Sequence, residues 1–247
     1  RHTRFKCDWS SDVCSSDLTF MGEEAAGVDA VRIAHSRIEA GQSDIVLVGG
    51  AFNSERPDLL MLYDFGGYIL KGTYAPVWER QSPGGTALGS LGAFVVFESR
   101  AHAEARSAKK LARLSQIYSH RSRRRPGDVE AALAQMWSKL GGSVDGRHAA
   151  FLSGATGAEP ATAEERAFLA SHKDIAVRAT GTYLGHGMEP QFPMNVALAT
   201  LAISHGRLFP SADRSGMELA MEGPLRQAIV TSVGHCRGEG LALIEAP

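Results

Sequence analysis

Cysteine is scarce in this sequence, and its distribution is uneven. Only three cysteines occur in 247 residues: Cys7 and Cys14 lie near the start, and Cys236 lies near the end. This number and spacing exclude a disulfide framework. A lone thiol in the body of the chain suits a reducing compartment, so we expect a cytoplasmic protein. The sequence has neither a Cys/His cluster with metal-ligand spacing nor a phosphate-binding loop, so we expect no metal and no organic cofactor.

An excess of charge of one sign is also missing, as are long apolar runs. Lys and Arg number 26 against 27 Asp and Glu, for a net charge of −1. No global field therefore favours binding to nucleic acid. No run approaches the roughly 20 apolar residues that span a bilayer, so we expect no membrane segment. What is present is 44% hydrophobic residues and 27 glycines, an ordinary composition for one large α/β domain or two modest ones.

The first 18 residues differ in character from the rest. They are rich in Ser and Asp, hold Cys7 and Cys14, and show neither helical nor strand periodicity. They resemble translated sequencing-adaptor sequence fused to a gene fragment, and we set residues 1–18 aside on that ground. The alternative is a genuine disordered N-terminal tail.

Patterns typical of helices and strands alternate over residues 19–247. Apolar periodicity predicts helices over 23–40, 100–110, 129–140, 161–171 and 194–205. Short apolar runs predict strands over 44–48, 91–98, 111–118, 149–153, 175–179, 228–233 and 240–245. We expect strand 44–48 to be covered on both faces. Asp128 should cap the helix predicted over 129–140. The last two strands should form a hairpin. Residues 53–83 are predicted to be rich in loops. The alternation indicates a largely parallel or mixed sheet with helical cover.

Three segments carry a resemblance to a known family. The first, residues 22–51, has the pattern of an amphipathic helix, a buried strand and the turn Gly49-Gly50. The second is Thr180-Gly-Thr-Tyr-Leu-Gly-His186, and the third is Ser232-Val-Gly-His-Cys-Arg-Gly238. Together they resemble the β-ketoacyl-acyl-carrier-protein synthases, the elongating ketosynthases of fatty-acid and polyketide synthesis.

The resemblance covers residues 19–247 and implies a fold. That fold is the α/β thiolase-like fold, with a duplicated five-layer αβαβα core. Residues 19–108 would be the remainder of the N-terminal half, and residues 109–247 the C-terminal half. The resemblance also implies that part of the first half is missing upstream. Lost strands would leave open sheet edges, which favour misfolding and aggregation.

Glu24 occupies the position at which the family carries its nucleophilic cysteine. The match counts back from the turn Gly49-Gly50. A carboxylate is a poor nucleophile toward a thioester, although its charge is favourable at a helix N-terminus. Related proteins with glutamine at this position decarboxylate malonyl-carrier or serve as inactive partners of a competent ketosynthase. The simpler alternative is that Glu23 and Glu24 are only favourable acids in a first helical turn.

Of the family's other catalytic positions, the resemblance finds one retained and two replaced. The resemblance places His186 at the second catalytic histidine, where an imidazole would bind the thioester carbonyl and stabilise an enolate. It places Ser153 at the first histidine, and Gly181 at a lysine. A structural role for His186, and a plain strand-end turn at Ser153, are the alternatives. Loss of several members of one catalytic unit removes most activity.

The closing loop and one arginine run complete the set of candidate residues. His235 takes the place of a phenylalanine that gates the family's acyl pocket. Cys236, beside it, has a counterpart in the acid/base cysteine of thiolases, with an ordinary loop thiol as the alternative. The run of Arg121, Arg123, Arg124 and Arg125 would suit docking of an acidic acyl carrier protein, with a solvated surface run as the alternative.

These features predict a β-ketoacyl-carrier-protein synthase family protein of acyl-chain elongation that does not condense. It would act as partner of a cysteine-bearing ketosynthase or as a malonyl-carrier decarboxylase. An active synthase with displaced catalytic residues is the rival prediction, and a thiolase-type enzyme using Cys236 ranks last. The expected partners are an acyl carrier protein with its phosphopantetheine-linked group, and a second subunit in a homodimer or heterodimer.

Overall fold

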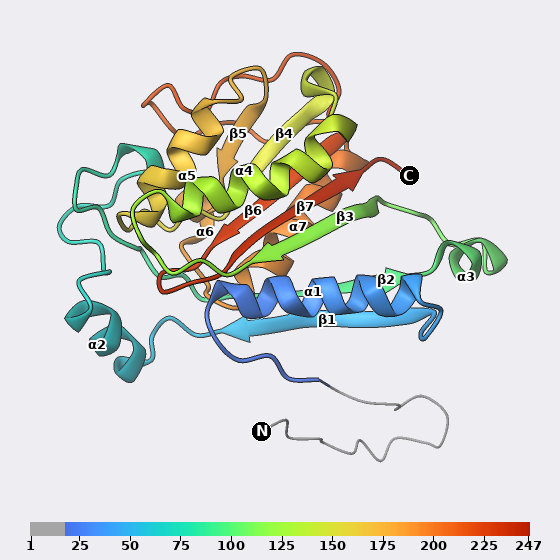
Figure 1. Ribbon diagram of the computed structural model, residues 1–247, viewed down its shortest axis with the longest axis horizontal. Helices are drawn as coiled ribbons and strands as arrows, with labels where there is room; N and C mark the ends of the chain where they lie inside the picture. Colours follow the sequence, from blue (N-terminus) through green and yellow to red (C-terminus); the bar gives the residue numbers. More distant parts are fainter. Residues whose placement is uncertain (1–17) are drawn as a thin grey trace.

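Residues 18–247 are described by a computed structural model, and their strands form two sheets (Figure 1). The larger sheet is mixed and has the order β3-β7-β6-β4-β5. Its strands are β3 (Arg113–His120), β4 (Ala149–Ser153), β5 (Ala176–Ala179), β6 (Gln227–Val233) and β7 (Glu239–Glu245). The smaller sheet pairs β1 (Ile45–Phe52) with β2 (Leu91–Glu98) in antiparallel fashion. The predicted adaptor-like segment lies almost wholly outside the described residues.

Helices separate and cover these sheets. The long helices are α1 (Glu24–Glu39), α4 (Asp128–Leu140), α5 (Ala161–Ala170) and α7 (Gln191–Ser204). Helices α4 and α5 cover one face of the larger sheet, while α1 and α7 pack between the two sheets (Figure 1). Shorter elements are α2 (Pro57–Phe65), α3 (Arg100–Ala105), α6 (Gly181–Leu184) and the 3-10 turns Val77–Glu79, Gly141–Ser143 and Gly146–His148. The described residues thus supply four successive layers in the order α, β, α and β.

Two hydrophobic cores hold the layers together. In α4, buried positions recur at helical spacing and meet Phe151 of β4 and Leu241 of β7. On the opposite face of the larger sheet, Val31 of α1 and Val196 of α7 pack against Leu152. The central strands are therefore apolar on both sides, as parallel or mixed sheets between helical layers require.

The two central helices approach each other closely at Gly27. A Cβ atom at this position would lie 2.2 Å from the carbonyl oxygen of Glu189 and 2.8 Å from Cδ of Pro193. Only glycine fits this contact without moving the backbone. The close approach places the N-terminus of α1 beside the loop that precedes α7.

Most predicted elements are confirmed, including the final hairpin, but two predictions are wrong. Strand β1 is not covered on both faces, because Ile45 is 50% and Leu47 63% exposed. Phe94 and Val96 of β2 continue this exposed apolar face, at 67% and 60%. Sequence reasoning also missed helix α2, which forms within the segment predicted to be loop.

The cap predicted for α4 is the second error. Asp128 is inside the helix, and its carboxylate accepts hydrogen bonds from the backbone N–H groups of Arg123 (3.2 Å) and Arg125 (3.0 Å). The free N–H of Val129 instead donates to Glu164 of α5, at 2.8 Å. A neighbouring helix therefore supplies the acceptor that the first turn of α4 needs.

Candidate functional site

Two buried side chains meet where α1 begins. Glu24 and His186 are each 1% exposed, and His186 Nε2 lies 2.6 Å from Glu24 Oε1. The backbone of His186 is held on both sides, because its N–H donates to Ala87 (2.8 Å) and its carbonyl accepts from Gly89 (3.0 Å). The structure therefore brings the residue at the predicted nucleophile position into direct contact with the predicted catalytic histidine.

Opposing influences act on the Glu24 carboxyl. Burial by itself raises the pKa of Glu24, whereas the hydrogen bond and charge of His186, with smaller help from His235 and the backbone, lower it. The net effect is a pKa below the usual 4.5. A carboxylate held in this way stays ionised and prefers to keep its imidazole partner.

Each member of the pair also has a polar atom without a partner. Glu24 Oε2 and His186 Nδ1 are buried and make no hydrogen bond within the described part of the chain. The second oxygen of Glu24 faces Gly234, where a Cβ atom would lie 2.9 Å away. The pair is thus tightly enclosed by the loop that joins β6 to β7.

His235 lies on that loop, next to the pair. Its ring centroid is 6.2 Å from that of His186. Tyr68 stacks on His235 at 4.8 Å, and Tyr63 of α2 meets it edge-on at 5.4 Å. His235 Nε2 lies 3.4 Å from Thr86 Oγ1. Sequence reasoning missed both tyrosines, because they fall in the segment predicted to be loop.

The environment of His235 favours its neutral form. Burial is the largest influence and lowers the pKa of His235, Glu24 opposes this, and His186 reinforces it. The net pKa lies below the ordinary 6.5. A neutral imidazole at this place adds a polar group beside the Glu24–His186 pair without adding a positive charge.

Cys236 is exposed and is a poor candidate for a thiolate. Its backbone N–H donates to Glu23 Oε2 at 2.7 Å. Burial of part of the thiol, followed by hydrogen bonding and charge from Glu23, raises the pKa of Cys236 above 9.0. Burial and the neighbouring carboxylates therefore both favour the protonated thiol, which disfavours nucleophilic chemistry.

Ser153 is engaged in a separate buried network. Its hydroxyl donates to Glu165 Oε1 at 2.7 Å and accepts from the N–H of Ala155 at 3.0 Å. Thr231 also donates to Glu165 Oε1, at 2.5 Å. Burial raises the pKa of Glu165 against the lowering effect of these hydrogen bonds. The hydroxyl of Ser153 thus binds Glu165, and neither of its two hydrogen bonds is to Glu24 or His186.

Glu165 itself was missed by sequence reasoning, although the signal was present. It lies on the apolar stripe of α5 between Thr162 and Phe168, where all three side chains are buried. An acidic residue on the buried stripe of an amphipathic helix indicates a specific polar contact.

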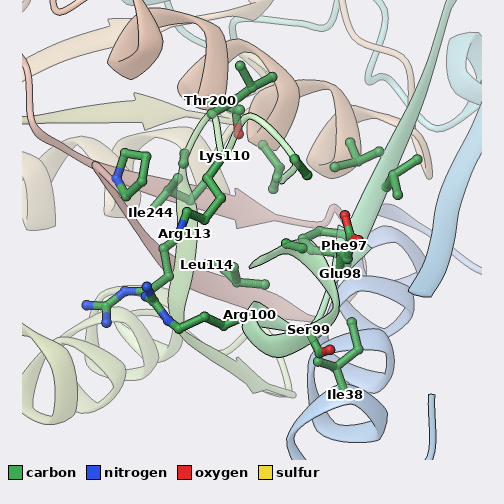
Figure 2. Close-up of a pocket in the computed structure, with 18 of the residues that line it drawn as sticks. Ile38, Phe97, Glu98, Ser99, Arg100, Lys110, Arg113, Leu114, Thr200 and Ile244 are labelled. Atoms are coloured by element: carbon green, nitrogen blue, oxygen red, sulfur yellow. The ribbon is translucent and has the colours of Figure 1, made fainter. Parts of the chain in front are cut away.

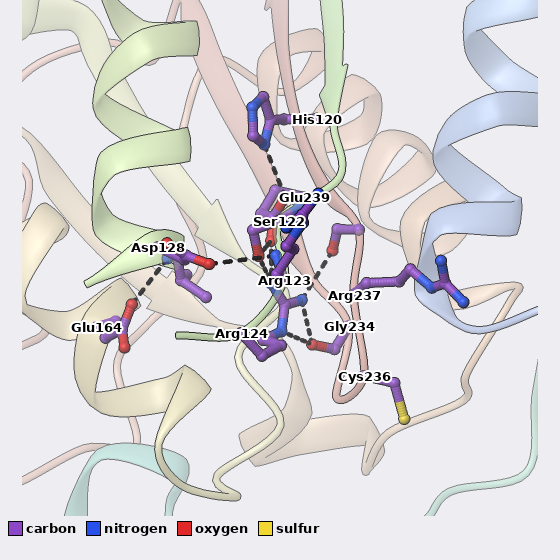
Figure 3. A network of polar contacts seen from close by, with 12 residues as sticks. His120, Ser122, Arg123, Arg124, Asp128, Glu164, Gly234, Cys236, Arg237 and Glu239 are labelled. Carbon is purple, nitrogen blue, oxygen red and sulfur yellow. Dashed lines mark hydrogen bonds and ion pairs between the residues drawn. The ribbon is translucent and has the colours of Figure 1, made fainter. Parts of the chain in front are cut away.

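Arg124 is directed inward and ties down the β6–β7 loop (Figure 3). Its Nε donates to the carbonyl of Gly234 at 3.1 Å, and its Nη2 donates to that of Gly238 at 3.2 Å. Its Nη1 forms an ion pair with Glu239, which is 1% exposed and also accepts from the hydroxyl of Ser122 at 2.7 Å. The guanidinium of Arg124 is therefore bound to groups of the same chain and does not extend from the surface as a docking residue would.

The other three arginines of the run remain at the surface. Arg121 is exposed and pairs with Asp29 of α1 at 2.8 Å. Arg123 and Arg125 are also exposed. A docking role for the run would rest on these three side chains.

Two other kinds of feature are absent from the described residues, a metal-binding cluster and a membrane-spanning helix. Between residues 18 and 247, no group of three or more His, Cys, Asp or Glu is placed to hold a metal ion. None of the helices in this range is long and apolar enough to cross a bilayer.

Comparison with known proteins identifies the fold. No family model and no curated protein sequence matches the chain. Among solved structures, the ishigamide ketosynthase/chain length factor is similar over 91% of this chain, with 20% identity and a TM-score of 0.76. The type II polyketide ketosynthase of the AntDE:AntF complex, solved with its acyl-carrier protein, is similar over 91%, with 16% identity and a TM-score of 0.77. A β-ketoacyl synthase from Burkholderia phymatum STM815 is similar over 93%, with 14% identity and a TM-score of 0.75.

These similarities show that the chain has the thiolase-like α/β fold of the ketosynthases, as predicted. The chain spans 59%, 62% and 61% of the lengths of the three structures.

Proposed function

We propose that this chain acts in acyl-chain elongation as a non-condensing partner of a cysteine-bearing ketosynthase. The observation that carries the proposal is the Glu24–His186 contact of 2.6 Å. The carboxylate of Glu24 stands at the start of α1, where the family has a thiol. It contacts His186 Nε2, so this nitrogen is not free to bind a substrate. Fatty-acid and polyketide synthesis are the two settings of such a reaction.

Chemistry at this pair disfavours condensation. Acyl transfer to Glu24 would exchange a thioester for a labile anhydride, and the carboxylate is buried and in contact with His186. The pKa of Cys236, the one cysteine among the described residues, is raised by burial and by its acidic neighbours, which favours the protonated thiol. Neither group supplies the activated nucleophile that covalent catalysis requires. An active synthase and a thiolase-type enzyme are therefore the less favoured alternatives.

A malonyl-carrier decarboxylase is the second candidate. The pair of imidazoles at His186 and His235 favours it, because imidazole donors stabilise a developing enolate. For this reaction the contact between His186 Nε2 and Glu24 must break, so that His186 Nε2 can bind the thioester carbonyl instead. The short contact between the two side chains makes that exchange unfavourable, so we rank this function below the partner role.

The proposed partners follow from the same context. They are an acyl carrier protein bearing a phosphopantetheine-linked acyl or malonyl group, and a second subunit in a homodimer or in a heterodimer with an active ketosynthase. Arg121, Arg123 and Arg125 are the side chains that we propose for carrier docking, since carrier proteins are acidic. The cytoplasm is the proposed compartment. We also retain the division into residues 1–18, 19–108 and 109–247 as a proposal.

The test measures masses of carrier and protein after incubation with malonyl-carrier and acyl-carrier. The partner role predicts no acyl-protein and no lengthened β-ketoacyl-carrier from this chain alone, together with a stable complex with a cysteine-bearing ketosynthase. A lengthened product from the chain alone would refute the proposal. Acetyl-carrier that disappears in His186→Ala would establish the decarboxylase instead.

A further inference from the structure

A cavity of about 780 Å³ lies between the outer strands of the two sheets (Figure 2). Strands β2 and β3 are terminal strands of their sheets and form two of its walls. The end of α1, one side of α7, the segment 99–112 that contains α3, and Ile244 and Pro247 at the C-terminal end complete the lining. Its volume falls in the range of roughly 300–1,000 Å³ found for small-molecule sites. Neither Glu24 nor His186 lines it, so it is separate from the candidate site described above.

Much of the lining of this cavity is hydrocarbon. Its apolar members come from α1, β2, β3, α7 and β7, and include Ile38, Val95, Phe97, Leu114, Val196 and Ile244. Two of them, Val196 and Ile244, belong to the core between the sheets. A flexible hydrocarbon chain would be stabilised by each methylene that such a surface buries.

The charged part of the lining is mostly basic. Five cationic side chains line the cavity against two acidic ones, Glu39 and Glu98; the cations are Arg100, Arg106, Lys109, Lys110 and Arg113. Figure 2 shows Arg100, Lys110 and Arg113 among the labelled lining residues. The excess of positive charge favours a ligand with an anionic group.

Two of these cations have spare capacity for a ligand. Arg106 is held by Glu98 through two hydrogen bonds of 2.6 Å each. In contrast, Arg100 approaches its acidic neighbour Glu104 only to 3.8 Å. Lys109 has no ion-pair partner between residues 18 and 247. Arg100 and Lys109 are therefore the side chains available to meet an incoming anion.

We propose that this cavity binds a long-chain fatty carboxylate, with its chain on the apolar lining and its carboxylate at Lys109 and Arg100. An uncharged hydrocarbon would leave these cations unused, and a small inorganic anion would leave the apolar lining uncovered. The proposal concerns a second site and does not rest on the role proposed for Glu24 and His186.

The experiment measures binding of tetradecanoate to the full chain by titration calorimetry, below the concentration at which the ligand forms micelles. Tetradecanol and acetate are titrated in parallel, because the first lacks the charge and the second lacks the chain. We expect saturable binding of one tetradecanoate per chain, binding of tetradecanol weaker by about threefold to tenfold, and no measurable binding of acetate.

Two variants locate the site. Arg100→Glu/Lys109→Glu should weaken tetradecanoate binding by about tenfold, and Thr200→Trp should abolish it by filling the cavity. Lys173→Glu is the matched control, because this exposed lysine precedes β5 at the opposite edge of the larger sheet. The proposal is overturned if tetradecanoate shows no saturable binding, or if the double charge reversal binds it as tightly as Lys173→Glu does. Because the charge variants alter only exposed side chains, this comparison holds even if Thr200→Trp fails to fold.

Discussion

Replacing His186 with alanine would test the electrostatic description of the candidate site. The substitution removes the partner of Glu24, a carboxylate that is 1% exposed and whose second oxygen makes no hydrogen bond within residues 18–247. Removing the partner of a buried carboxylate costs about 3–5 kcal/mol, because the negative charge is left buried without compensation. For a protein of this size, each kcal/mol lowers the melting temperature by about 2–4 °C. We therefore expect a fall of roughly 6–20 °C.

A double-mutant cycle separates this charge effect from simple loss of packing. Glu24→Ala/His186→Ala removes the carboxylate together with its imidazole partner, so it should cost less than the sum of the two single changes. We expect a coupling free energy of about 2–3 kcal/mol, measured by urea unfolding followed by circular dichroism at pH 7. Additivity within about 0.5 kcal/mol would refute the coupling, and with it the view that the contact between carboxylate and imidazole stabilises the fold.

The same pair gives a pH dependence with a definite sign. The folded-state pKa of Glu24 lies below its unfolded value of 4.5. Its contribution to stability is therefore fully present above pH 4.5, and is lost as the pH falls through the folded pKa. The difference in unfolding free energy between the parent chain and Glu24→Ala should shrink as the pH is lowered below 4.5. An unchanged difference would contradict the assigned pKa direction.

Three further changes probe the surroundings of the site. Arg124→Met leaves Glu239 buried without its cation, so we expect a loss of about 3–5 kcal/mol in urea unfolding, with Arg125→Met close to the parent because that side chain is exposed. Glu165→Gln should raise the free energy of unfolding at neutral pH, because the raised pKa of this acid makes its ionisation unfavourable in the fold. The parent chain should lose stability as the pH rises above 4.5, and the Gln variant should lose less. A Gln variant with the parent's pH profile would count against this. Gly27→Ala should lower the melting temperature through about 1–3 kcal/mol of overpacking, and an unchanged melting temperature would contradict the close helix contact.

Local sequence patterns were sufficient for most of the fold. The strand at 149–153 and the closing hairpin were predictable because short apolar runs bounded by glycine have few alternatives. The exposure of β1 could not be predicted, since Ile45 and Leu47 look the same in sequence whether or not a layer covers them. Coverage is a property of tertiary packing, which periodicity does not contain.

The candidate site was predictable in part. The resemblance pointed to Glu24 and His186, but only the three-dimensional arrangement shows the hydrogen bond between them, because they are 162 residues apart in sequence. The inward turn of Arg124 was hidden inside a run of arginines that all look solvent-exposed. The tyrosines around His235 were hidden for a different reason, since aromatic residues in a glycine-rich segment have no periodicity to mark them.

The β1–β2 ribbon has a consequence for local opening of the fold. A two-stranded ribbon is marginally stable alone, and this one is supported by α1 and α7 on one face while its other face is exposed. Regions with few buried contacts open first in the native state. Amide hydrogens of β1 and β2 should therefore exchange with deuterium sooner than those of β6 and β7, which lie between two helical layers. The molecule would then have two cooperative units, and the start of α1, with Glu24, lies at their boundary.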